Sequence, residues 1–277
     1  MKRKFKRVDL YVFGLFALIS VSCVIVFLLP ADMQELLKAR SDNWNLLSFW
    51  ASILVHSNLE HLLGNVTTFL FLGFIVFEIN RKSGREQEFL CSIIIAIIAL
   101  PFIDNISFML LAKSVIKQTV VSCGLSTIVA SLAGLIVPSL GIFLKEPLQS
   151  ERNTLYFLVS FILLTGSSIA LPYVDFNLYN LMVFIATLVL GMLLLIHVGS
   201  KIVNFAEQNQ RARKTIIDAF ITVIVYFISV FGLFPSKITM PEGGFVNIFS
   251  HHVGVFYGMI TGIYTLNVFP KRKIDAS

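Results

Sequence analysis

Long apolar stretches separated by short polar segments dominate this chain. An α-helix needs about 20 mostly apolar residues to cross roughly 30 Å of hydrocarbon, and eight stretches approach that length. The pattern therefore predicts an all-α polytopic membrane protein with about eight transmembrane helices. The predicted spans are residues 8–30, 60–79, 88–111, 122–144, 154–173, 178–199, 215–234 and 249–269.

The composition supports this class. Hydrophobic residues make up 56% of the chain and charged residues 14%, whereas about a quarter of the residues in soluble domains are charged. No linker, low-complexity segment or repeat of fixed period divides residues 1–277. We therefore expect a single membrane-embedded domain.

The basic residues predict how the spans are oriented. They cluster in segments that would be cytoplasmic if the N-terminus lay inside, such as 2–7, 81–85, 211–214 and 271–273. Short cytoplasmic loops are enriched in Lys and Arg, so both termini are expected to be cytoplasmic. The same distribution accounts for the net charge of +6 without nucleic acid, because a nucleic-acid-binding protein gathers its basic residues on one face.

With this topology, three spans that run from outside to inside begin with polar side chains at a similar depth. They carry His61 with Asn65, Ser126, and His251. Polar groups inside a bilayer are costly and are usually functional. A serine becomes a nucleophile when a base takes its proton, a histidine is a suitable base near neutral pH, and amide or imidazole groups stabilise an oxyanion. This set therefore indicates acyl-transfer chemistry.

Helix packing is predicted to bring the serine and the histidine together. Small residues at four-residue spacing allow membrane helices to approach closely, and His252 lies about 100° further around its helix than His251. His251 is therefore the predicted base. The small or short side chains that share the faces of Ser126 and His251 are Ala130, Ala133 and Val137 in one span, and Gly254, Gly258 and Gly262 in the other.

Three motifs, in this order, resemble the rhomboid family of intramembrane serine proteases. They are His56-x4-His61-x3-Asn65, Gly124-x-Ser126 and Ser250-His251-x2-Gly254-x3-Gly258. The resemblance implies a rhomboid-like helical bundle with a six-helix core. Because this chain has three spans between the serine and histidine helices where the family has one, an extra helix pair is expected within about 154–234.

The resemblance also implies roles for individual residues. Ser126 is implied to be the nucleophile and His251 the base, as a dyad without an acid, and His61 and Asn65 are implied to form the oxyanion hole. The family cleaves transmembrane helices of other membrane proteins and needs neither a cofactor nor a metal. We expect an outward-facing site in a prokaryotic plasma membrane. The other implied site residues are Gly124 and Leu125, which line the oxyanion or substrate-binding region, and His56, Gly254 and Gly258, which support it.

This chain differs from the family pattern beside the nucleophile. Thr127 follows Ser126 where the family usually has glycine, and Ser131 stands where a glycine is common. A β-branched residue next to the nucleophile is expected to crowd the substrate or the oxyanion pocket. The sequence thus keeps open a rhomboid-like pseudoprotease that binds transmembrane clients without cleaving them.

A metal or proton transporter is another alternative, because histidines bind metal ions well and ionisable groups inside membranes often form proton relays. Among the acidic residues, Glu78, beside Arg81 and Lys82, is expected to form a structural ion pair or a snorkelling contact. Asp104 and Asp175 are expected to be hydrated or interfacial. The residues that such a transporter would use are His56, His61, His251, His252 and Asp104.

Overall fold

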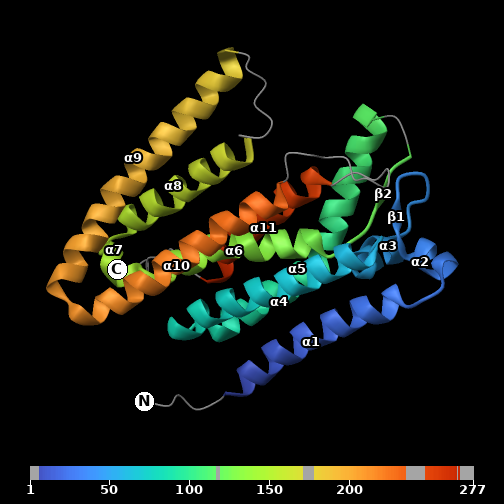
Figure 1. Cartoon of the computed structure of the whole chain (residues 1–277), viewed down its shortest axis with the longest axis horizontal. Coiled ribbons are helices and arrows are strands. Elements are labelled where there is room, and N and C mark those ends of the chain that lie inside the picture. The colour runs from blue at the N-terminus through green and yellow to red at the C-terminus, as the bar shows by residue number, and fades with distance from the viewer. Residues whose placement is uncertain (1–5, 117–118, 171–177, 235–246, 267, 269–277) are drawn as a thin grey trace, which may run out of the picture.

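The computed structural model describes residues 6–116, 119–170, 178–234, 247–266 and 268, and these are almost entirely helical (Figure 1). Two strands, β1 (Ala39–Arg40) and β2 (Val121–Ser122), a 3-10 turn η1 (Ser52–Leu54) and a π-turn η2 (Ala112–Ile116) complete the described secondary structure. The helices are α1 (Arg7–Phe27), α2 (Ala31–Leu37), α3 (Leu46–Ala51), α4 (Leu59–Lys82), α5 (Glu86–Leu111), α6 (Ser126–Phe143), α7 (Lys145–Leu148), α8 (Glu151–Ala170), α9 (Leu178–Gln208), α10 (Gln210–Leu233) and α11 (Ile248–Thr265).

Within the described residues, seven helices are long and apolar enough to cross a membrane, namely α1, α4, α5, α6, α8, α9 and α10. The prediction of an all-α, multi-pass membrane protein is therefore confirmed. The eighth predicted span corresponds to α11, which has 18 residues and carries His251 and His252 in its first turn. This helix is not among the seven that are long and apolar enough to cross a membrane.

Helix α6 is the centre of the bundle. Of the residues in its span 83% are buried, compared with 11% in α9. Helices α4, α5, α8, α10 and α11 all pack against it. The helix that carries Ser126 is thus enclosed by protein along its whole length.

Helices α6 and α11 meet backbone to backbone. A Cβ atom on Gly254 would lie 2.4 Å from the carbonyl oxygen of Thr127, and one on Gly258 would lie 1.9 Å from that of Ser131. Only glycine allows this approach, which confirms the predicted packing face of α11. On α6, Ala130 alone of the three predicted small residues is among the atoms nearest these glycines, because the contact follows the adjacent backbone carbonyls.

The segment between α1 and α4 is attached to the start of α6 and to α5. Ala39 pairs with Ser122 across the two-stranded sheet. Pro101 lies inside α5 and cannot donate to the carbonyl of Ile97, four residues earlier. The indole N–H of Trp50 donates to that carbonyl at 3.0 Å, so α3 is fastened at the position that the proline leaves open.

Helices α8 and α9 lie side by side in Figure 1 and pack closely together. A Cβ atom on Gly191 would lie 3.0 Å from Cγ of Leu164, and the hydroxyls of Ser167 and Thr187 are hydrogen-bonded at 2.9 Å. Helix α9 ends at Gln208, beyond the predicted residue 199. Hydropathy marks where the apolar stretch ends and not where the helix ends.

Helix α10 packs against α6, α8 and α9. Near its start, Asp218 accepts from Lys82 of α4 at 2.7 Å. On α4 itself, Arg81 donates to Glu78 at 2.8 Å, so the ion pair predicted for Glu78 is confirmed.

Candidate active site

Ser126 is the first residue of α6, although the predicted span began at residue 122. Ser122 is instead in β2, where it pairs with Ala39, and Gly124 has φ +113°, a conformation that favours glycine. The first N–H groups of an α-helix have no acceptor within the helix. The Ser126 hydroxyl therefore lies beside unpaired helical N–H donors, at a backbone turn that glycine makes possible.

Backbone and imidazole contacts hold the turn before Ser126 in place. The N–H of Gly124 donates to the carbonyl of Ser52 at 2.9 Å. The N–H of Leu125 points at Nε2 of His56 at 3.4 Å, and the Leu125 side chain is fully buried. Gly124 and Leu125 thus contribute the position of this turn, while their own N–H groups are already paired.

His56 is buried and adopts one neutral tautomer. Its Nδ1 lies 3.2 Å from the carbonyl oxygen of Leu54, which can only accept, so Nδ1 carries the proton. Its Nε2 faces the Leu125 N–H and therefore accepts. Burial, and secondarily the nearby His61, lower the pKa of His56 to about 4. The neutral imidazole thus links the Leu54 carbonyl to the turn before Ser126 and holds that turn in place.

His61 and Asn65 converge on Gly124 from α4. A Cβ atom on Gly124 would lie 2.9 Å from Nε2 of His61 and 3.5 Å from Nδ2 of Asn65. In the described part of the chain, the buried Nδ2 of Asn65 has no hydrogen-bond partner. Ser57 lies 3.2 Å from Nδ1 of His61. The predicted pair therefore faces the turn next to Ser126, with a buried donor still available.

His251 is buried in the first turn of α11. Its Nδ1 is hydrogen-bonded to the carbonyl oxygen of Leu233, at the end of α10. Because that oxygen can only accept, Nδ1 carries the proton and Nε2 is the unprotonated nitrogen. His252 instead bonds to Ile248 of its own helix at 2.8 Å. Both adjacent histidines thus have an unprotonated Nε2, and they differ in that the His251 ring is anchored to another helix, α10, whereas the His252 ring is anchored to its own helix.

Ser126 and His251 lie at the same level of the α6–α11 pair. Gly254, one turn after His251, contacts Thr127 and Ala130, so the first turns of the two helices are neighbours. No hydrogen bond joins the Ser126 hydroxyl to His251 within the described residues. Catalytic hydrogen bonds are often long before substrate binds.

Asp104 was predicted to be hydrated or interfacial, and this is wrong. Its side chain is only 3% exposed, because α5 packs against both α6 and α11. The Thr127 hydroxyl donates to Oδ2 of Asp104 at 2.8 Å. The Thr127 side chain is thereby directed towards α5, while His61 and Asn65 face Gly124. Asp175 lies outside the described residues.

The sequence analysis missed several contacts that shape the site. Asn105 donates to the carbonyl of Phe49 at 2.8 Å and to the hydroxyl of Ser52 at 3.0 Å. Ser52 in turn receives the N–H of Gly124. Two adjacent polar residues, Asp104 and Asn105, within an apolar span indicate that this part of α5 makes polar contacts with neighbouring segments. The hydrogen bond from His251 to the Leu233 carbonyl could not be predicted, because every residue carries a backbone carbonyl.

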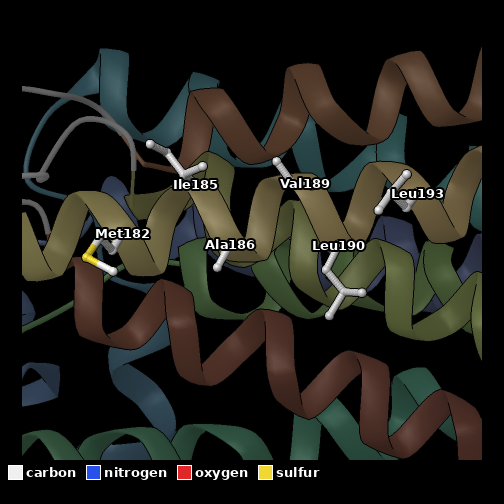
Figure 2. A pocket seen from close by; sticks show the side chains of 6 residues that line it. All are labelled: Met182, Ile185, Ala186, Val189, Leu190 and Leu193. Carbon is white, nitrogen blue, oxygen red and sulfur yellow. The ribbon is translucent and has the colours of Figure 1, made fainter.

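A hollow of about 470 Å³ lies along α9, away from these residues. Figure 2 shows its lining side chains on successive turns of that one helix. All are apolar, so the hollow offers no group for acyl-transfer chemistry. Its lining residues are Met182, Ile185, Ala186, Val189, Leu190 and Leu193.

Among the described residues, no three His, Cys, Asp or Glu side chains come together in an arrangement that could hold a metal ion. No protein-family model, no curated protein and no solved structure matches this chain. The resemblance to rhomboids therefore depends on the three sequence motifs. The structure adds to these motifs the placement of His61 and Asn65 beside Gly124.

Proposed function

We propose that this chain is an intramembrane serine protease of the rhomboid type, which cleaves transmembrane helices of other membrane proteins. The observation that carries the proposal is the convergence of His61 Nε2 and Asn65 Nδ2 on Gly124, at the turn that opens the serine helix. The glycine contacts of α11 add His251 at the same level. These contacts support the assignment of Ser126 as the nucleophile, His251 as the base, and His61 with Asn65 as the anion-stabilising donors.

In the proposed reaction, the Ser126 hydroxyl attacks the carbonyl carbon of the scissile peptide while its proton passes to Nε2 of His251. His251 then gives this proton to the leaving amine as the C–N bond breaks, which leaves an acyl-enzyme. Water next attacks the ester and transfers a proton to His251, which returns it to Ser126 as the ester bond breaks. The carbonyl of Leu233 keeps the His251 ring in the required tautomer.

The oxyanion of the tetrahedral intermediate needs donors already aimed at it. With Ser57 donating to Nδ1 of His61, the Nε2 atom carries the proton and faces the turn at Gly124. The free Nδ2 of Asn65 and the N–H of Ser126 complete the proposed oxyanion hole. His56 supports it indirectly by holding Leu125.

In this proposal, α10 corresponds to the single helix that rhomboids have between the serine and histidine helices, and α8 with α9 is the extra pair. Two contacts of α10 support this assignment: its last residue, Leu233, bonds to His251, and its Asp218 bonds to α4. Helix α9 is mostly exposed and contributes no residue to the site. We also propose cytoplasmic termini, an outward-facing site and a prokaryotic plasma membrane.

A rhomboid-like pseudoprotease is the second candidate. The absence of a hydrogen bond between Ser126 and His251 in the described structure favours it. Such a protein would bind transmembrane clients through the same helices without forming an acyl-enzyme.

Cleavage of a generic rhomboid substrate in proteoliposomes tests the proposal and separates the candidates. We expect the wild type to cleave, Ser126→Ala and His251→Ala to lose cleavage while still binding substrate, and a metal chelator to have no effect. His252→Ala is the matched control and should still cleave, because its imidazole bonds within its own helix. Substrate binding by the wild type without any cleavage would favour the pseudoprotease.

A further inference from the structure

A buried carboxyl group lies between the two helices that carry the proposed dyad. Asp104 of α5 is 3% exposed, and its Oδ2 accepts the Thr127 hydroxyl of α6 at 2.8 Å. The Ser250 hydroxyl of α11 is close enough to interact with the same carboxyl. In the described part of the chain, however, neither Ser250 Oγ nor Asp104 Oδ1 has a hydrogen-bond partner.

The positions of these contacts in the sequence are informative. Thr127 directly follows Ser126, and Ser250 directly precedes His251. Asp104 therefore binds the first turn that carries the nucleophile through Oδ2, and its carboxyl group lies near Ser250 in the first turn that carries the base. It is not the acid of a triad, because Nδ1 of His251 is bonded to the carbonyl of Leu233.

The next residue of α5, Asn105, contacts the segment that holds Gly124. Asn105 donates to Phe49 and Ser52, and Ser52 accepts the N–H of Gly124. A carboxyl inside a membrane helix is costly to bury and is usually functional. Two adjacent residues of α5 are thus connected to Thr127 directly and to Gly124 through Ser52.

We propose that Asp104 is a positioning residue, which holds the first turns of α6 and α11 in register so that His251 reaches Ser126. Its effect on catalysis rests on the proposed function, whereas its effect on helix register does not. This role also accounts for Thr127 in place of the glycine usual in rhomboids, because glycine could not donate to Asp104.

The kinetic test compares Asp104→Leu, which cannot accept a hydrogen bond, with Asp104→Asn, which retains an oxygen acceptor. We expect Asp104→Leu to lower kcat and the rate of fluorophosphonate labelling on the order of 10- to 100-fold, with KM nearly unchanged. Asp104→Asn should restore most of the rate. Ser92→Ala is the matched control, since Ser92 also joins α5 to α11 through Thr265 but far from the dyad.

Thr127→Val supplies a second comparison. It removes the hydroxyl and keeps the shape of the side chain. It should also lower kcat, and the double variant with Asp104→Leu should be no slower than Asp104→Leu alone, because both changes remove the same bond. A merely structural role predicts something different: a lower melting temperature and fewer active sites, with an unchanged rate per active site.

Helix register is measured without catalysis by cross-linking cysteines placed at both dyad positions. The chain carries Ser126→Cys and His251→Cys, its three native cysteines are replaced by alanine, and a short bifunctional thiol reagent is added. We expect efficient cross-linking with Asp104 or Asp104→Asn and a clear loss with Asp104→Leu.

The two measurements separate failure of this inference from failure of the proposed function. If the wild type neither cleaves nor labels but cross-linking still depends on Asp104, the protease proposal fails and the positioning role stands. If Asp104→Leu labels, cleaves and cross-links like the wild type, the positioning role is overturned while the protease proposal stands. An Asp104→Asn variant as slow as Asp104→Leu in a folded protein would also overturn it.

Discussion

A single methyl group at Gly258 should separate the two helices of the proposed dyad. In the structure, a Cβ atom at this position would lie 1.9 Å from the carbonyl oxygen of Ser131 and 3.0 Å from the backbone nitrogen of Leu135. Real Cβ atoms essentially never approach other heavy atoms closer than 3.0 Å. The obstructing atoms belong to the backbone and cannot rotate away. Gly258→Ala must therefore move α11 away from α6 by at least about 1.1 Å, the difference between the 3.0 Å limit and the 1.9 Å separation from the Ser131 oxygen.

This displacement has two expected consequences. Overpacking of a tight contact costs about 1–3 kcal/mol of stability, so the melting temperature should fall. A misplacement of ~1 Å in a catalytic group can cost about 100-fold in rate, so Ser126 should react with a fluorophosphonate roughly 10- to 100-fold more slowly. The rate is measured on folded protein, at a temperature well below the melting transition of the variant.

Gly166→Ala provides the matched control. Gly166 lies in α8, and a Cβ atom there would meet nothing within 4 Å. Alanine is also favoured over glycine in a helix by up to about 1 kcal/mol, so this variant should label normally and be at least as stable as the wild type. If Gly258→Ala labels at the wild-type rate, the close α6–α11 contact does not position His251, and the reasoning is refuted.

Two further predictions concern Asn65 of α4 and the nearby His56. Asn65→Ala should lower kcat about 10²- to 10³-fold, the usual cost of losing one oxyanion donor, with little change in melting temperature because Nδ2 has no partner in the described structure. Asn80→Ala is its control and should lower stability instead, since Asn80 bonds to Ser139 of α6; the reverse result would exclude Asn65 from the oxyanion hole. The folded-state pKa of His56 is about 4 and an unfolded histidine has a pKa of about 6.5, so unfolding takes up a proton between these values. The contribution of His56 to the free energy of unfolding is therefore fully present above pH 6.5 and should fall by about 3 kcal/mol towards pH 4. In thermal unfolding at several pH values, His56→Gln should reduce this dependence and His197→Gln, at an exposed position, should retain it; equal pH profiles for His56→Gln and the wild type would contradict the assignment.

Hydropathy was sufficient to predict the helices because each span must be apolar for about 20 residues. It did not predict the start of α6, since Ser122 joins β2 by pairing with Ala39, a residue far away in the sequence. The end of α9 was missed for another reason: this helix continues to Gln208, past its apolar stretch.

The candidate site was predictable where helical spacing alone decides the geometry. His61 and Asn65, four residues apart, share a face of α4, and Gly254 shares a face of α11 with His251. The location of Asp104 was not predictable, because its burial depends on how α5, α6 and α11 pack together. The sequence shows that Asp104 is polar, but it does not show which helices pack over its side chain.

The most direct test of the central claim is to locate the adduct of a fluorophosphonate on the chain by mass spectrometry. The account predicts phosphonylation of the Ser126 oxygen in the wild type, strong suppression in His251→Ala, and no suppression in His252→Ala. Folded wild-type protein that stays unmodified, or that is modified at another serine independently of His251, would contradict it.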